Sequence, residues 1–371
     1  MDVVIIGGGL AGLISSILLA REGWRVTLIE KKSYPFHRVC GEYISNEVIP
    51  FLQLHKLYPE ALKPARISRF LLSDTGGNAY SMPLDLGGFG ISRYNYDHWL
   101  SQQAVRSGVH LMTETTVQSI TYIQNQFRLK TSQGELNATY AIGAFGKRAN
   151  LDRELKRTFF HKKSPYLGVK YHVKNDNLDP DYISLHNFRG GYCGVSQVDG
   201  GRYNICYLSE RKNLRTTSSI EKMEEKVLFQ NTRIQSLFES SDFLFDAPLV
   251  INEISFAPKE PVVNHMLMTG DAAGMITPLC GNGMAMAIHG AKILSEHLIQ
   301  HNKIGSSRQE LELSYTKEWK RTFQGRHWAG RQIQSALFGT HKSSKIALNI
   351  AKKLPRVAQW LMKQTHGQPF S

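Results

Sequence analysis

The stretch Gly7-Gly8-Gly9-Leu10-Ala11-Gly12 has the spacing G-x-G-x-x-G and joins two apolar runs. The run before it, Val3 to Ile6, is typical of a buried strand, and the run after it, Leu13 to Ala20, is typical of a helix. In this setting Gly7 permits a tight turn, Gly9 lets the backbone approach a pyrophosphate, and Gly12 allows close packing of helix on strand. The free N–H groups of that helix face the anion, aided by the helix dipole.

The residues that follow complete a βαβ unit. Gly23 ends the helix, Arg25 to Ile29 forms a second strand, and Glu30 closes that strand. A carboxylate at this position accepts hydrogen bonds from the ribose hydroxyls of an adenosine. The alternative is a turn that only packs a helix on a sheet, but it leaves the third glycine and the acid unexplained. The sequence therefore predicts a nucleotide-binding site.

Periodicity beyond this unit predicts an interrupted α/β protein. Strands are expected at 67–73, 79–82, 110–113 and 266–269, and alternating antiparallel strands over 166–208. Helices are expected at 99–106 and 284–298, a helix-rich insert from about 219 to 238, and helix beyond 311. The expected fold is a Rossmann-like lobe with an inserted antiparallel β-sheet substrate lobe and a helical C-terminus. We place the nucleotide-binding domain at 1–65, 90–155 and 260–310, the substrate domain at 66–89 and 156–259, and a basic C-terminal region at 311–371.

A second glycine-rich motif lies late in the chain, where Gly270-Asp271-Ala272-Ala273-Gly274 is followed by Pro278, Gly281 and Gly283 before a helix. With the first motif, it resembles the p-hydroxybenzoate hydroxylase and geranylgeranyl reductase superfamily, whose flavoproteins carry G-D-A-A-G-x-x-x-P-x-x-G-x-G. The resemblance implies FAD as cofactor, with Asp271 accepting from a ribityl hydroxyl and Pro278 shaping the turn beside the ring. Free N–H groups at the helix N-terminus stabilise charge on reduced flavin. The alternative is a strand-to-helix loop with packing glycines.

Other stretches match the same superfamily. Arg93 resembles the arginine that reaches the cofactor, and Val117 the residue whose backbone meets adenine. Cys40-Gly41-Glu42 looks like the C-G-E segment of geranylgeranyl reductases, which lies over the flavin. There the Cys40 thiol is a candidate proton donor, or else a small buried hydrophobe, and Arg38 a candidate pyrophosphate ligand. The candidate FAD-binding residues are Gly7, Gly9, Leu10, Ala11, Gly12, Glu30, Lys31, Arg38, Cys40, Gly41, Arg93, Val117, Gly270, Asp271, Pro278, Gly281, Gly283 and Met284.

The sequence also departs from the superfamily pattern. The G-A-D-G turn is Gly143-Ala144-Phe145-Gly146, so the acid linked to NAD(P)H contacts is absent and NAD(P)H is an uncertain electron donor. The aromatic strand of the reductases is incomplete, which leaves prenyl specificity open, and the halogenase W-x-W-x-I-P signature is missing. The leading hypothesis is reduction of an apolar, isoprenoid-like or polyketide-like molecule. The alternatives are an FAD-dependent aromatic hydroxylase and a membrane-associated flavin-binding protein without turnover.

Charge is concentrated in the C-terminal part of this chain, whose net charge is +14. After Glu318 there are ten lysines and arginines and no acid. Ile346, Ile350, Leu354, Val357 and Leu361 are expected on one face of a cationic helix kinked at Pro355, which either docks on the protein or contacts a membrane. Nucleic acid is not an expected partner, because no recognised motif accompanies the charge.

The remaining sequence features constrain location and metal binding. The first strand leaves no room for a secretion signal, and apolar runs are too short to span a bilayer. The four cysteines form no C-x-x-C pair, and His297 and His301 lack a third ligand, so no metal site is expected. We expect a cytoplasmic protein, with peripheral membrane contact as an open alternative.

Overall fold

Six strands form the sheet that carries the first glycine motif. Their order is β17 (Val262–Val263), β18 (Met266–Met268), β10 (Tyr140–Gly143), β1 (Asp2–Ile6), β2 (Arg25–Ile29) and β6 (His110–Met112), parallel except between β17 and β18. The computed structural model describes residues 1–161, 164–252, 254–337 and 340–371. Val3, Val4 and Ile5 are fully buried because elements cover both faces of the sheet.

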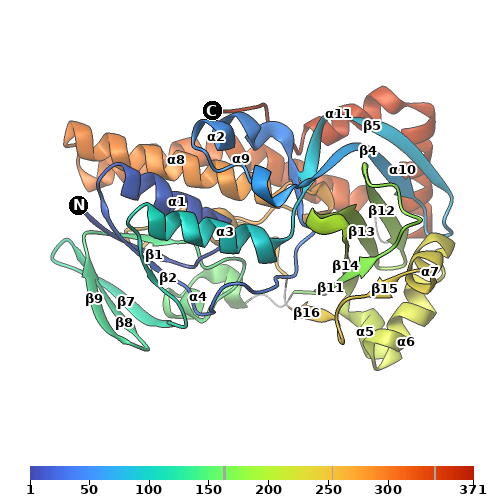
Figure 1. Ribbon diagram of the computed structural model, residues 1–371, viewed down its shortest axis with the longest axis horizontal. Helices are drawn as coiled ribbons and strands as arrows, with labels where there is room; N and C mark the ends of the chain where they lie inside the picture. The colour runs from blue at the N-terminus through green and yellow to red at the C-terminus, as the bar shows by residue number, and fades with distance from the viewer. Residues whose placement is uncertain (162–163, 253, 338–339) are drawn as a thin grey trace.

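Helices cover one face of this sheet and a small sheet covers the other (Figure 1). The helices are α1 (Leu10–Arg21), α3 (Arg93–Arg106) and α8 (Gly283–Ile304), and α1 packs on both of the others. The small sheet consists of β7 (Val117–Ile123), β8 (Gln126–Thr131) and β9 (Gly134–Ala138), followed by α4 (Asn150–Glu154). This lobe has the expected Rossmann-like arrangement.

A nine-stranded sheet builds the second lobe. Its main path is β15 (Asp242–Phe243), β11 (Tyr166–Lys174), β14 (Tyr203–Glu210), β13 (Gly191–Gln197), β12 (Tyr182–Phe188), β4 (Ala65–Ser73), β5 (Ala79–Gly90) and β3 (Tyr43–Ser45), and β16 (Leu249–Asn252) also pairs with β11. Pairing is antiparallel except between β4 and β12. The expected α/β fold with an inserted, largely antiparallel sheet and a helical C-terminus is confirmed, whereas the domain boundaries stay a prediction.

Several expected helices have different bounds in the structure. Helix α3 begins six positions earlier than expected, because the Ser92 hydroxyl caps it by accepting from the Asn95 N–H at 3.3 Å. The helix-rich insert expected from about 219 to 238 is present. It is divided into α6 (Ile220–Met223), a π-helical turn (Glu224–Leu228) and α7 (Thr232–Glu239), since Asn231 caps a new start. Helices α2 (Ile49–Leu54) and α5 (Arg211–Thr217) were not anticipated.

The C-terminal region corrects the expected apolar face. Helix α9 (Arg308–Leu337) is followed by α10 (His341–Lys353) and α11 (Pro355–Lys363), which break at Leu354 rather than forming one kinked helix. Pro355 opens α11 because it lacks the N–H that would continue α10. The buried face of α10 is made by Ser344, Ala347, Leu348 and Ala351, whereas Ile346, Leu354 and Val357 are exposed. The predicted stripe is therefore not the docking face.

The last residues are not helical, contrary to expectation. The Thr365 carbonyl accepts from Asn282 Nδ2 at 3.0 Å, and the Phe370 N–H donates to the Glu47 carbonyl at 3.2 Å. The Phe370 ring stacks on His289 with a centroid distance of 3.9 Å. The chain end thus returns to the first lobe and fastens α10 and α11 across the second. Among the described residues, no helix has both the length and the apolarity to cross a bilayer.

Candidate active site

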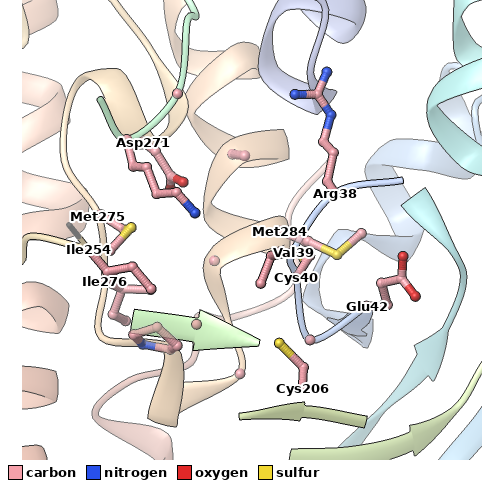
Figure 2. Close-up of a pocket in the computed structure, with 18 of the residues that line it drawn as sticks. Arg38, Val39, Cys40, Glu42, Cys206, Ile254, Asp271, Met275, Ile276 and Met284 are labelled. Atoms are coloured by element: carbon pink, nitrogen blue, oxygen red, sulfur yellow. The ribbon is translucent and has the colours of Figure 1, made fainter. Parts of the chain in front are cut away.

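One cavity of about 1180 Å³ extends from the first glycine motif to the nine-stranded sheet and the C-terminal helices. Figure 2 shows the Asp271 side chain on one side of this cavity and Val39 and Cys40 on the other. The structure brings the candidate residues together around it: Gly7, Gly9, Leu10, Ala11, Glu30, Lys31, Arg38, Cys40, Gly41, Arg93, Val117, Gly270, Asp271, Pro278, Gly281, Gly283 and Met284. Gly12 is the one candidate FAD-binding residue that does not line this cavity. Their contacts to a cofactor stay a prediction.

The first glycine motif is a tight junction between β1, α1 and the end of β10. Gly7 has φ of +109°, and a Cβ there would lie 2.4 Å from the Ala144 carbonyl oxygen. A Cβ on Gly12 would lie 2.0 Å from the Gly7 carbonyl oxygen. At Gly9, the N-cap of α1, the nearest neighbour of such a Cβ is Arg93 Nη2 at 3.4 Å. Gly7 and Gly12 close the backbone junction, and Gly9 presents bare backbone to the cavity.

Glu30 lies at the end of β2, where the sequence placed it. Its Oε2 accepts from the Gly8 N–H at 2.9 Å and from Arg38 Nη2 at 3.1 Å. The Tyr34 hydroxyl, which the sequence gave no reason to single out, donates to the Gly8 carbonyl at 2.5 Å. The carboxylate is 4% exposed and lines the cavity, as expected for an acceptor of ribose hydroxyls.

Two arginines share one buried acid beside the first motif. Arg38 Nε is 3.0 Å from Asp97 Oδ2, and Arg93 Nε is 2.7 Å from Asp97 Oδ1. Burial by itself lowers the pKa of Arg93, but Asp97 and the nearby Cys40 thiol raise it well above its usual value. Asp97 was missed in the sequence, although it lies four positions after Arg93 on one helix face. It holds both guanidinium groups, as cations, beside the phosphate cradle.

The second glycine motif opens α8 on the same cavity. Short 3₁₀ turns at Gly270–Ala272 and Pro278–Cys280 precede Gly281, whose φ of +64° is left-handed, and α8 begins at Gly283. Within the described residues, no hydrogen bond reaches the Asp271 carboxylate, which faces the cavity (Figure 2). An open carboxylate and two helix N-termini on one cavity fit the ribityl and pyrophosphate parts of FAD.

Lys259 joins the turn after β10 to the loop of the second glycine motif, and sequence patterns had not identified it. Its Nζ donates to the Lys147 and Asp271 carbonyls, each at 2.7 Å, and the residue is 8% exposed. Burial lowers the pKa of Lys259 to about 8, opposed by Asp271 and Asp152. Phe145 lines the cavity in the turn where the superfamily has an acid. Lys259, which is distant in the sequence, therefore holds this turn in place.

Replacing Lys259 with methionine is expected to weaken FAD binding about ten- to a hundredfold. The change leaves two partly buried carbonyls without their donor, at up to about 1–3 kcal/mol each when unpaired. Reconstitution of the apoprotein, followed by flavin fluorescence, measures the affinity. The exposed Lys303, which pairs with Glu22 at the surface, provides the control Lys303→Met. Wild-type affinity in Lys259→Met contradicts the role of this clamp.

A buried ion network positions the Cys40-Gly41-Glu42 segment. Glu42 Oε1 is 2.5 Å from Lys170 Nζ, and Oε2 is 2.6 Å from His172 Nε2, with all three side chains at most 1% exposed. The Cys40 carbonyl accepts from Asn204 Nδ2 at 3.1 Å. These partners lie on β11 and β14, so the second lobe holds this segment against the cavity. Glu42 was quoted in the sequence, but Lys170 and His172 carried no local signal.

The two histidines considered as metal ligands form hydrogen bonds with other residues of the protein. His301 shares hydrogen bonds with the Tyr140 hydroxyl at 2.9 Å and with Ser306 at 2.6 Å, and His297 Nδ1 lies 2.8 Å from the Ile293 carbonyl. The described part of the chain contains no cluster of three metal-ligating side chains. Both histidines therefore have structural partners.

Comparison with known proteins identifies the family. A family model described as an FAD binding domain matches residues 1–325. Conditioned medium factor receptor 1 of Dictyostelium discoideum is 26% identical over 353 residues, covering 87% of this chain and 68% of that protein. Digeranylgeranylglycerophospholipid reductase of Methanosarcina acetivorans is 25% identical over 348 residues, covering 86% and 81%.

Solved structures have the same fold. A geranylgeranyl bacteriochlorophyll reductase-like protein from Thermoplasma acidophilum has a TM-score of 0.77 at 16% identity, covering 98% of both chains. The halogenase PltM in complex with phloroglucinol and FAD has a TM-score of 0.77 at 17% identity, covering 97% of this chain and 82% of that one. The superfamily resemblance is thereby confirmed. With residues 1–325 matched, this chain belongs to the FAD binding domain family and is an FAD-dependent oxidoreductase.

Proposed function

We propose that this oxidoreductase reduces an apolar, isoprenoid-like or polyketide-like substrate, as reductases similar to it in sequence suggest by their names. The observation that carries the proposal is that one cavity is lined both by the two glycine motifs, which would hold FAD, and by an apolar wall from the second lobe. When bound and reduced, FAD supplies a hydride. The protein then has to bind the substrate, exclude water and provide a proton.

Apolar side chains from the second lobe form the substrate wall. Leu72, Met82, Leu185, Leu208 and Ile254 are each at most 6% exposed and line the cavity. Such a wall favours a hydrocarbon chain, because burying apolar surface is favourable while burying an unpaired polar group is costly. It also keeps water from the reacting atoms.

Cys40 is the proposed proton donor, at its Sγ atom. It lines the cavity and lies beside the Arg93 guanidinium. Reduction of a carbon–carbon double bond adds one hydride and one proton, so a proton source has to lie on the substrate side. Cys206 on β14 also lines the cavity, but burial raises the pKa of its thiol to about 12. A thiol with so high a pKa gives up its proton poorly near neutral pH.

The reaction is tested by anaerobic turnover. Photoreduced holoenzyme is mixed with an unsaturated isoprenoid, and flavin absorbance and product mass are recorded. Return of the oxidised flavin spectrum with a product heavier by two hydrogens supports the reductase. In a parallel aerobic reaction, oxygen consumption matched by hydroxylated product replaces the reductase with the monooxygenase alternative. Flavin that no acceptor reoxidises leaves only the non-catalytic binding protein.

Cys40→Ala is expected to slow substrate reduction about 10²–10⁴-fold, the usual contribution of a positioned acid. The flavin should still bind and photoreduce, because Arg93 and the glycine motifs are unchanged. Single-turnover rates of flavin reoxidation by substrate measure the effect. Cys206→Ala, at the other cavity thiol, is the matched control and should lose far less. Equal losses in the two variants exclude a specific role for Cys40.

We further propose that the substrate is reached at a membrane surface, because long apolar chains reside in bilayers. The basic C-terminal region supports this proposal.

A further inference from the structure

Helices α10 and α11 expose large apolar side chains to solvent. Ile346, Leu354, Val357 and Trp360 are 54%, 53%, 42% and 58% exposed, and we call these four residues the C-terminal apolar patch. The small side chains Ala347 and Ala351 already pack α10 on the second lobe. The patch therefore has no role in holding the helices to the protein. Figure 1 shows the two helices at the outer edge of that lobe, over β5.

Four cations flank the patch in sequence. Lys345 precedes Ile346, Lys352 and Lys353 precede Leu354, and Arg356 precedes Val357, and all four cations are exposed. Within the part of the chain that the structure describes, none of the four forms an ion pair, whereas Lys363 pairs with Asp85 at 3.0 Å. A large apolar group beside unpaired lysines is the composition of a helix that lies on a lipid surface.

We propose that the C-terminal apolar patch docks the protein on an anionic lipid bilayer. The patch side chains enter the boundary between headgroups and acyl chains, a depth that tryptophan favours. The flanking cations bind the lipid phosphates, since long basic side chains reach to the headgroups while their stems lie on apolar surface. This inference rests on the proposed function, because it names the surface from which the apolar substrate comes.

Charge favours a bilayer over a second copy of the chain. A two-fold interface places the same patch on both copies, so the four unpaired cations of one would face those of the other. An anionic bilayer instead offers opposite charge around an apolar interior, matching both features of the patch. Nucleic acid offers the charge but leaves the apolar side chains exposed to water.

The same two helices also line the cavity. Ile350 of α10 and Ala358, Leu361 and Met362 of α11 belong to its wall. Ile350 follows Ile346 by one helical turn, and Leu361 follows Val357 by one turn, so the cavity wall borders the patch on each helix. The apolar part of the cavity therefore lies next to the surface from which the substrate chain would be drawn.

Vesicle sedimentation with the FAD-loaded full-length protein tests the docking surface. Phosphatidylcholine vesicles are compared with vesicles that contain phosphatidylglycerol, at low and high salt. Wild-type protein should sediment with the anionic vesicles and be released by salt. Replacing Lys345, Lys352, Lys353 and Arg356 with glutamine should reduce partitioning at least about tenfold, since each basic residue near an anionic surface strengthens binding.

The apolar half is tested separately by Leu354→Ser with Val357→Ser and Trp360→Ser. This variant should also lose binding, while Ile304→Ser with Leu313→Ser, two comparably exposed residues at the junction of α8 and α9, should bind normally. Brominated lipids should quench the fluorescence of wild-type protein more than that of Trp360→Phe. Wild-type protein left in the supernatant, equal binding to neutral vesicles, or a patch-dependent dimer in solution would overturn the proposal.

The vesicle measurements need no substrate, so their outcome does not depend on whether the proposed reaction is correct. Flavin absorbance and single-turnover reduction in detergent solution should remain normal in the patch variants. Loss of docking with normal turnover in detergent supports both proposals. Normal docking without any turnover contradicts the proposed reductase activity but still supports the proposed docking surface.

Discussion

Gly12→Ala is expected to give a protein that no longer retains FAD during purification. The new Cβ would lie 2.0 Å from the Gly7 carbonyl oxygen and 3.3 Å from the Ala144 Cβ. The Gly7 carbonyl oxygen belongs to the backbone, so the clash is relieved only if α1 moves away from β1. The free N–H groups at the start of α1 would move with it. Overpacking of this kind costs about 1–3 kcal/mol of stability. The loss of the phosphate cradle should lower FAD affinity at least about a hundredfold, equal to some 2.8 kcal/mol.

The flavin-to-protein absorbance ratio, titration of apoprotein with FAD, and thermal unfolding measure these effects. Gly325→Ala is the matched control, because Gly325 is an exposed glycine within α9 with no atom within 4 Å of an added Cβ. It should retain FAD and gain about 0.5–1 kcal/mol of stability from the better helix former. A yellow, fully loaded Gly12→Ala protein contradicts the proposed position of the cofactor.

Glu42→Gln is expected to lower the free energy of unfolding by about 3–5 kcal/mol, the usual effect of breaking a buried ion pair. The variant leaves the Lys170 ammonium buried with neutral acceptors alone, namely the new amide oxygen and the Arg38 carbonyl at 3.1 Å. It also releases the segment that carries Cys40. Chemical denaturation of the holoenzyme measures the loss, and turnover should fall with it.

Acid dependence gives an independent readout of the same network. Burial by itself raises the pKa of Glu42, but Lys170 and His172 lower it to about 2, below its ordinary 4.5. A carboxylate with a lower pKa when folded stabilises the fold above pH 4.5 and loses that contribution as the pH falls towards 2. Between pH 4.5 and 2, the free energy of unfolding of the wild type should fall by about 3 kcal/mol more than that of Glu42→Gln.

Two further variants make the Glu42 result interpretable. Asp2→Asn breaks the ion pair with Arg25, whose side chain is 81% exposed, and should cost less than about 1 kcal/mol because exposed pairs are solvated. Glu42→Gln combined with Lys170→Met removes the stranded charge and should recover part of the stability. If Glu42→Gln is as stable as Asp2→Asn across the pH range, the network does not hold the segment.

Local sequence patterns predicted much of the cofactor-binding lobe. The turn at Gly7 and the helix starts at Gly9 and Gly283 follow from backbone sterics and hydrogen bonding over a few neighbouring residues. Strand and helix periodicity likewise depends on residues close in the chain. These motifs therefore indicated the Rossmann-like lobe and FAD, and the family match over residues 1–325 agrees.

Local sequence patterns gave the wrong buried face for the C-terminal helices, because tertiary packing decides which face of a helix is buried. Ile346 and Leu354 satisfied helical periodicity, yet the second lobe accepts the smaller Ala347 and Ala351 instead. Periodicity reports which residues share a face, but close packing selects the face whose shape fits the surface opposite. The break at Leu354 also rotates α11 relative to α10.

The amino-acid order alone determined the two glycine-rich turns, the alternation of strands and helices, and the cluster of positive charge near the C-terminus. Only the tertiary structure decided which side chains support the site. Glu42 and His172 are 130 positions apart, and Lys259 fastens the Lys147 carbonyl from 112 positions away. Such contacts depend on how two lobes meet in space, so a short window of residues does not contain them.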